Sequence, residues 1–336
     1  MRPGLIGLPL AILLAACGTG TSSSPIGAGI DARIAPPGDS GDPDGGSLPA
    51  PVRGFQIKSP EIMIPHGTEI TYCYYFKTPN TEALPIKSWQ SHMSAGSHHM
   101  ILYTTASEQK PAGTLSTDEC GGAGLDAGVW TYSSQTVDQT FHMPADDGTG
   151  LPLAQNMPPG QPAYVQMHYL NATDDDIKVH IELNANAYDP GVAVRGAAPY
   201  VTYNANISIP AAPGSTASAS GSCPVSPSLK FFTLSTHDHK QGIHTAVKDD
   251  TTMVFQSTDW EHPGQQDWGA SPFFSFASGK LSYQCDYLNA AGTRAPIVDG
   301  PSAATNEMCM AIGYFFDPSS TVTSSKLCLN SFVIPQ

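Results

Sequence analysis

The stretch Leu234-Ser-Thr-His-Asp-His-Lys-Gln-Gly242 carries two histidines, His237 and His239, separated by one residue. The aromatic and aliphatic run before it, Leu229-Lys-Phe-Phe-Thr-Leu234, predicts a β-strand that continues through both histidines. Side chains two residues apart on a strand point to the same face, about 7 Å apart along the backbone. Two imidazoles can therefore converge on one metal ion here. Taken alone, such a pair is more often explained by exposed histidines on a polar face.

The composition around this stretch is that of a β protein. Charged residues make up only 13% of the 336 residues, and 32 glycines and 30 prolines divide the chain into short segments. No segment keeps a 3.6-residue period between caps, which predicts an all-β fold of antiparallel sandwiches. Aromatic or alternating runs predict strands at 69–76, 97–105, 164–170, 178–183, 200–203, 206–209, 229–239, 252–256, 280–285 and 309–316.

The N-terminus has the features of a targeting segment. Arg2 precedes an apolar run over 5–14, and the following Leu14-Ala-Ala-Cys17 resembles a bacterial lipobox. This resemblance implies that residues 1–17 are a signal peptide and that Cys17 is lipidated. The apolar run is too short to span a bilayer, so we expect an anchored exported lipoprotein. Gly18 after the cysteine favours the outer membrane, on its periplasmic side or at the cell surface.

The rest of the chain divides into a tether and two predicted domains. Residues 18–50 are rich in Gly, Ser, Pro and Asp, which predicts a flexible tether. We expect one β-sandwich over 51–190 and a second over 191–336, with the boundary near residues 187–197. The net charge of −14 argues against nucleic acid as a partner and against membrane contact other than through the lipid anchor.

Six cysteines remain after Cys17. An even number in an exported chain predicts three disulfides, and the absence of a C-x-x-C pair argues against a zinc knuckle. The spacing alone leaves all 15 connectivities open. The six residues are Cys73, Cys120, Cys223, Cys285, Cys309 and Cys328.

The candidate metal ligands are five histidines and one methionine, divided between the two predicted domains. Neutral imidazole suits copper and zinc, and a thioether favours Cu(I), whereas catalytic zinc rarely uses methionine. Two adjacent histidines point to opposite faces of a regular strand, so a shared ion requires a strand end or a bulge. Otherwise one of the two is a surface or core histidine, and the methionine fills core space. The candidates are His98, His99 and His168 in the first half and His237, His239 and Met308 in the second.

Four short motifs in this order resemble the copper type II, ascorbate-dependent monooxygenases, the family of peptidylglycine α-hydroxylating monooxygenase and dopamine β-monooxygenase. They are His98-His99-Met100, Gln166-Met-His-Tyr169, His237-Asp-His239 and Glu307-Met-Cys309, and the resemblance covers roughly residues 55–330. It implies two consecutive antiparallel jelly-roll β-sandwich domains with one copper in each, facing a solvent-filled interdomain cleft.

The resemblance also implies a role for each motif. His98, His99 and His168 match an electron-transfer copper site. His237, His239 and Met308 match the catalytic copper, where dioxygen binds and a substrate C–H bond is broken. The implied activity is hydroxylation of a small molecule or peptide, with ascorbate as reductant. The disulfides it implies are Cys73–Cys120, Cys223–Cys328 and Cys285–Cys309.

Three positions depart from the peptide-hydroxylating members. Ser235 stands where they have Arg, Ile312 where they have Tyr, and Met310 where they have Asn. These changes argue against a carboxylate-binding pocket and favour a more apolar one. Asp238 replaces a Thr, and we expect it to point away from the metal.

Two other functions fit parts of the pattern. A copper-binding surface lipoprotein without hydroxylase activity would keep the same ligands. A carbohydrate-binding jelly roll would explain the aromatic residues but would leave the histidines and Met308 without a role. We expect the loop Asp259-Trp-Glu-His262 at the rim of the cleft and His142 as a candidate support of the ligands. The other histidines, His66, His92, His180, His244 and His262, fit surface or hydrogen-bonded positions.

Overall fold

The computed structural model describes residues 47–118, 120, 128–303 and 305–335. This part of the chain forms strands and turns and contains no helix, so the all-β prediction is confirmed. Among these residues, no helical segment has the length and apolarity needed to cross a lipid bilayer. The predicted signal peptide, Cys17 and most of the predicted tether lie outside the described residues.

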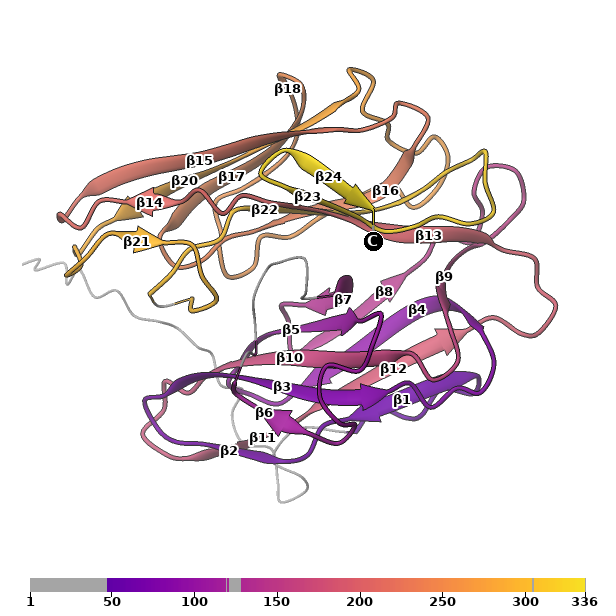
Figure 1. The fold of residues 1–336 in the computed structure, drawn as a ribbon, viewed down its shortest axis with the longest axis horizontal. Helices are drawn as coiled ribbons and strands as arrows, with labels where there is room; N and C mark the ends of the chain where they lie inside the picture. Colours follow the sequence, from indigo (N-terminus) through magenta and orange to yellow (C-terminus); the bar gives the residue numbers. More distant parts are fainter. Residues whose placement is uncertain (1–46, 119, 121–127, 304, 336) are drawn as a thin grey trace, which may run out of the picture. The chain divides into compact units, whose positions relative to one another are not determined.

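An 11-stranded sheet runs through both halves of the chain (Figure 1). Its strands are β1 (Gly54–Lys58), β4 (Leu84–Met93), β8 (Asp138–His142), β9 (Leu153–Met157), β12 (Ile181–Ala187), β13 (Arg195–Tyr203), β16 (Lys230–His237), β19 (Gln266–Asp267), β22 (Met310–Phe316), β23 (Lys326–Leu329) and β24 (Phe332–Pro335). The main path is β1-β12-β4-β9-β13-β22-β16-β19. The β8 strand pairs with β4, β23 pairs with β13, and β24 pairs with β23.

The two halves of this sheet meet at β13. Its first residues pair in parallel with β9, with Arg195 opposite Leu153. The buried Arg195 guanidinium forms an ion pair with Asp147 and donates a hydrogen bond of 2.7 Å to the Ser320 carbonyl. The expected boundary near residues 187–197 therefore coincides with the start of a strand that connects both halves. The division into two domains stays a prediction.

A five-stranded sheet carries the first set of histidines. Its strands are β3 (Glu69–Lys77), β5 (Ser97–Thr104), β6 (Leu115–Ser116), β7 (Val129–Ser134) and β10 (Pro162–Leu170). They lie in the order β6-β3-β10-β5-β7 (Figure 1). Because side chains alternate along a strand, Val165, Met167 and Tyr169 of β10 pack into one hydrophobic core, while Tyr164 packs on the other face, which it shares with His168.

The second half adds a four-stranded sheet in the order β15-β20-β17-β18. It comprises β15 (Ser215–Pro224), β17 (Gly242–Asp249), β18 (Thr252–Ser257) and β20 (Lys280–Asn289). Its inner side chains, including Leu281, Tyr283 and Tyr287 of β20, pack into a second core with Phe231 and Phe315. Two small sheets complete the fold: β2 (Ile62–Ile64) with β11 (Ile177–Val179), and β14 (Ser208–Ile209) with β21 (Ile297–Val298).

A third apolar cluster joins the five-stranded sheet to β13, β22 and β23. On the five-stranded sheet it contains a row of four directly opposed aromatic residues, Tyr75, Tyr164, Tyr103 and Trp130. Opposed aromatic pairs stabilise neighbouring strands. The row packs with Val201, Tyr203, Met310, Ile312 and Leu327 of the second half. This packing brings the histidines of β5 and β10 next to the end of β16.

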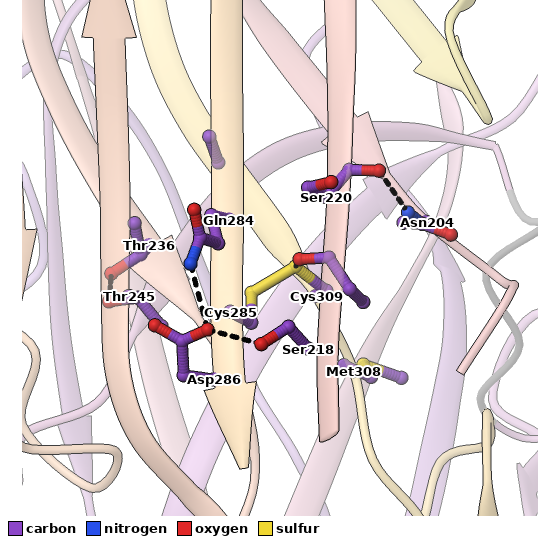
Figure 2. Close-up of a disulfide and its surroundings, with 12 residues drawn as sticks. Asn204, Ser218, Ser220, Thr236, Thr245, Gln284, Cys285, Asp286, Met308 and Cys309 are labelled. Atoms are coloured by element: carbon purple, nitrogen blue, oxygen red, sulfur yellow. Dashed lines mark hydrogen bonds between the residues drawn. A yellow bond between two sulfur atoms is a disulfide. The ribbon is translucent and has the colours of Figure 1, made fainter. Parts of the chain in front are cut away.

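The three disulfides join the pairs that the family resemblance implied: Cys73–Cys120, Cys223–Cys328 and Cys285–Cys309. Cys285 lies in β20, and Cys309 directly precedes β22. Figure 2 shows this third disulfide with Met308 beside it.

The last residues of the predicted tether dock on β12. Glu182 is only 2% exposed, and its carboxylate accepts hydrogen bonds from the Leu48 N–H at 2.6 Å and the Ser47 hydroxyl at 2.9 Å. The Asn184 amide donates to the Pro49 carbonyl. A buried carboxylate requires such donors. Residues 47–49 are therefore bound to the sheet, which corrects the expectation of a free tether up to residue 50.

Candidate metal centre

A β-bulge brings His98 and His99 to one site. His99 lies opposite His168, and Ser97 lies opposite Tyr169, so His98 is the extra residue between two pairs. An extra residue breaks the alternation of side chains, which was the condition for two adjacent histidines to share an ion. One ligand atom each of His98, His99 and His168 lies within 4.8 Å of the others.

The hydrogen bonds of His168 determine which ring nitrogen is free. Its Nε2 lies 2.8 Å from Glu69 Oε1, so neutral His168 donates its hydrogen to this carboxylate. The lone pair then lies on Nδ1, which is buried without a hydrogen-bond partner among the described residues. His99 Nδ1 is also buried and has no hydrogen-bond partner among the described residues. Carboxylates commonly orient metal-binding histidines in this way.

The second set lies at the end of β16. The strand ends at His237, and His239 lies in the following turn, so the prediction of one strand through both residues is wrong for His239. The reason is Glu307, whose buried carboxylate accepts the N–H groups of His239 at 2.9 Å and Gln241 at 2.6 Å. Even so, the His237 and His239 ring centroids are 5.2 Å apart.

Protein groups also hold one nitrogen of each of these rings. His239 Nδ1 lies 3.2 Å from the Asn306 carbonyl and donates to it, which leaves Nε2 buried and without a partner in the described part of the chain. His237 Nδ1 lies 2.8 Å from the side-chain amide of Gln135. The Gln135 NH₂ group donates this hydrogen bond and Nδ1 accepts it, so a neutral His237 ring carries its hydrogen on Nε2. To bind a metal, His237 would have to give up this contact or its Nε2 hydrogen.

Burial keeps these imidazoles neutral. Desolvation, reinforced by neighbouring histidines, lowers the pKa of His98 to about 3. Desolvation lowers the pKa of His239 to about 4, against the effect of the bond to Asn306. The pKa values of His99 and His237 are well below the usual range for the same main reason. Neutral rings offer a lone pair to a metal at pH 7.

The two histidine sets meet in this structure. The His99 and His237 ring centroids are 5.5 Å apart, and both side chains are buried. The family resemblance instead implies two separate sites that face each other across a solvent-filled cleft. The difference follows from the third apolar cluster, in which Trp130 packs beside His237 with a centroid distance of 6.5 Å. The five histidines therefore form one continuous cluster.

Met308 lies next to the turn that carries His239. The preceding residue, Glu307, holds this turn, and the following residue, Cys309, is bonded to Cys285 (Figure 2). The Met308 side chain packs at the edge of the third apolar cluster, and its carbonyl accepts a 2.8 Å hydrogen bond from the Tyr287 hydroxyl. The backbone of Met308 is thus firmly held, while its role as a sulfur ligand stays a prediction.

Asp238, between the two histidines, is also buried. Its carboxylate lies against Gly242, where a Cβ atom would come within 1.8 Å of Oδ2. Desolvation raises the pKa of Asp238 to about 7. Only glycine leaves room at position 242 for this side chain.

Several residues that support the cluster were not identified from the sequence. Glu69 and Gln135 are 99 and 102 residues away from the histidines that they contact, so no local motif marks them. Trp260 lies in the loop predicted at the rim, and its ring is 5.2 Å from that of His98. His142, considered as a support of the ligands, is exposed on β8.

A pocket of about 340 Å³ adjoins the cluster. One wall is the segment from Tyr132 to Phe141, and the other is formed by β16, β22 and the loop residues His262, Gly264 and Gln265. Gln135, which contacts His237, lines the pocket, and so do Ser235 and Ile312.

Comparison with known proteins identifies no family. No family model matches the chain, and no curated protein matches it. The crystal structure of the STIV MCP is similar with a TM-score of 0.30 and 10% identity, over 79% of this chain and 98% of that one. The structure of infectious bursal disease virus, Gt strain, has a TM-score of 0.12 and 10% identity, over 86% and 84%. At these scores neither likeness supports a conclusion about fold or function.

Proposed function

We propose that this protein is a copper-dependent monooxygenase that hydroxylates a C–H bond of an external small molecule or peptide. The observation that carries the proposal is a set of buried ring nitrogens without partners among the described residues: His99 Nδ1, His168 Nδ1 and His239 Nε2. Leaving a buried polar atom unsatisfied costs about 1–3 kcal/mol. Metal ions bound at the two sites would satisfy these atoms.

Copper is the metal that the donor set favours. Imidazoles alone would accept zinc, copper, iron or nickel. The predicted thioether ligand, Met308, selects for Cu(I), and Glu69 is occupied as the hydrogen-bond acceptor of His168. The resemblance of the four motifs to the copper type II monooxygenases supports the same choice.

The finer architecture is part of this proposal. We assign one copper to His98, His99 and His168 for electron transfer, and a second to His237, His239 and Met308 for dioxygen chemistry. Each would belong to one of two jelly-roll domains, 51–190 and 191–336. Copper supplies the one-electron steps: one oxygen atom of dioxygen enters the C–H bond, and the other leaves as water with two protons and two electrons from a reductant such as ascorbate.

The chain itself would prepare the cluster for this chemistry. Glu69, Gln135 and the Asn306 carbonyl orient the rings of His168, His237 and His239. Glu307 holds the turn that carries His239. Burial lowers the pKa values of His98, His99, His237 and His239 and so keeps these four imidazoles unprotonated. In the cell, the Cys17 lipid would anchor the enzyme to the outer membrane of a bacterium.

Metal analysis tests the proposal directly. The mature chain, purified with copper available, should hold two ions. The double variant His98→Ala/His99→Ala should hold one, because its second site keeps His237, His239 and Met308. A wild-type protein that holds one copper or none would contradict the two-site assignment.

Activity separates the proposal from a copper-binding lipoprotein without hydroxylase function. With ascorbate and a small-molecule library, the enzyme should consume oxygen in step with a product whose mass is greater by one oxygen atom. Two bound coppers without any product across the library would favour the lipoprotein that only binds copper.

A further inference from the structure

The described lining of the pocket beside His237 carries no carboxylate, ammonium or guanidinium group. This described lining includes no Asp, Glu, Lys or Arg; it consists of hydroxyl, amide, aromatic and aliphatic side chains and the exposed imidazole of His262. Burying a charged ligand group without a partner is strongly unfavourable. This lining therefore selects against carboxylate-bearing and ammonium-bearing molecules.

The aromatic residues of the pocket offer apolar surface only. The Tyr132 hydroxyl lies 2.9 Å from Ser91 Oγ, and the Tyr314 hydroxyl donates to the Thr131 carbonyl at 3.1 Å. Phe141 packs against Tyr314 with a centroid distance of 4.6 Å. Because the phenol hydroxyls are used within the protein, these rings present carbon to the pocket. They suit an aromatic or aliphatic body.

Three polar side chains of the pocket lining donate to backbone carbonyls and keep acceptor oxygens. Ser235 donates its hydroxyl hydrogen to the Gly264 carbonyl at 2.5 Å, and Thr136 donates to the Asp138 carbonyl at 2.9 Å. Gln139 uses its NH₂ on the Ser133 carbonyl at 3.2 Å. Each keeps an oxygen lone pair. A ligand with O–H or N–H donors would satisfy these oxygens.

The position of the pocket relates it to the histidine cluster. Thr233 and Ser235 precede His237 by four and two residues on β16, so the three side chains share one strand face. Gln135 lines the pocket and contacts the His237 ring at 2.8 Å. A molecule in the pocket would thus lie one side chain away from the cluster.

We infer that this pocket binds an uncharged small molecule that carries hydroxyl or N–H donors on an aromatic or aliphatic frame. The role of this ligand as the substrate of the histidine cluster rests on the proposed function, whereas its binding to the pocket does not. The volume of about 340 Å³ lies near the lower end of small-molecule sites, which favours a compact molecule over an extended peptide.

Three probes that differ in charge test the inference on metal-free mature protein. 4-Hydroxyphenylacetamide is neutral, 4-hydroxyphenylacetate is an anion, and tyramine is a cation at pH 8. Calorimetric titration should show saturable binding of the amide, tighter than either charged probe by about tenfold or more. Equal or tighter binding of a charged probe would overturn the inference, and so would the absence of binding by all three.

Two variants locate the binding. Ser235→Arg adds a guanidinium to the wall, so it should gain binding of the acetate and weaken binding of the amide. Ser222→Arg makes the same change in a separate groove on β15, and its probe affinities should stay at the wild-type values. If both variants gained binding of the acetate, the assignment to this pocket would be overturned. The assignment would also be overturned if neither variant gained it while both had the melting temperature of wild type. Since no copper is present, a failed copper analysis would leave this result intact.

Discussion

His168 donates its Nε2 hydrogen to Glu69 Oε1 over 2.8 Å, and its Nδ1 is buried without a hydrogen-bond partner among the described residues. Glu69 opens β3, the neighbour of the strand that carries His168. The carboxylate therefore sets the tautomer that a metal at this site would need.

Replacing Glu69 tests this relationship. Glu69→Ala should lower the copper affinity of the three-histidine site by about 10–100-fold, the usual loss when such a support is removed. Glu69→Gln should retain much of the affinity, because its amide oxygen still accepts the Nε2 hydrogen. Competition with a chromogenic Cu(I) chelator measures both. Glu61→Ala, which removes an exposed carboxylate paired with Lys178, is the control and should bind as wild type. Equal affinities for all three variants would exclude an orienting role.

Replacing Met308 tests whether the second site performs copper–oxygen chemistry or only binds a metal. Met308→Ile conserves volume, so the free energy of unfolding should change by less than about 1.5 kcal/mol. Copper at the His237 and His239 site should weaken, and hydroxylation should be lost, while the three-histidine site still accepts an electron from ascorbate.

Met310→Ile is the matched control for packing. Met310 is 2% exposed and pairs with His237 across the sheet, so it tests whether any methionine replaced near the site has the same effect. We expect it to keep both coppers, with a Cu(I) affinity like that of wild type. Cu(I) affinity and product formation are measured on both variants. Wild-type values for Met308→Ile would show that Met308 only packs in the protein and is not a copper ligand.

The disulfides allow stability and site geometry to be separated. Cys223–Cys328 closes a span of 105 residues, and Cys285–Cys309 closes 24. Removing either bridge should lower the free energy of unfolding by about 2–4 kcal/mol, with the larger loss for the longer span. Only Cys285→Ala/Cys309→Ala should also weaken copper at the Met308 site, because this bridge holds the neighbour of Met308. Chemical denaturation and copper titration of the two double variants should thus rank them in opposite orders.

The buried ion pair between Asp147 and Arg195 predicts acid sensitivity. Burial by itself would raise the pKa of Asp147, but the Thr149 hydroxyl, the Arg195 guanidinium and backbone N–H groups lower it to about 2. A folded-state pKa below the unfolded one contributes stability that is present above about pH 4 and is lost as the pH falls through 2. Thermal melts of the metal-free protein between pH 5 and 2 should show this loss.

Asp147→Asn should remove this part of the pH dependence. It should also destabilise the protein by about 3–5 kcal/mol at neutral pH, because Arg195 would stay buried without its counter-charge. Asp250→Asn breaks the exposed pair with Lys280 and should cost less than about 1 kcal/mol. A similar small loss in both variants would show that the Arg195 pair does not hold the start of β13.

The candidate ligands could be chosen from the sequence because ligand chemistry depends on residue type. Imidazoles and a thioether were recognisable from their motifs, and the adjacent pair His98 and His99 required a bulge, which the pairing with His168 contains. The strand prediction for residues 229–239 is wrong at His239. A strand was expected to continue through it, but Glu307, 68 residues away, accepts its N–H and ends the strand.

The sequence by itself determined the all-β class and the number of disulfides. Each follows from local alternation, turn residues or cysteine count. Only the tertiary structure decided that Glu69 orients His168, that His99 and His237 lie 5.5 Å apart and that the pocket wall carries no charge. Glu69 and His168 are 99 positions apart, and His99 and His237 are 237 − 99 = 138 apart. These contacts depend on strand register and on the packing of one sheet against another, and no local pattern of side chains encodes them.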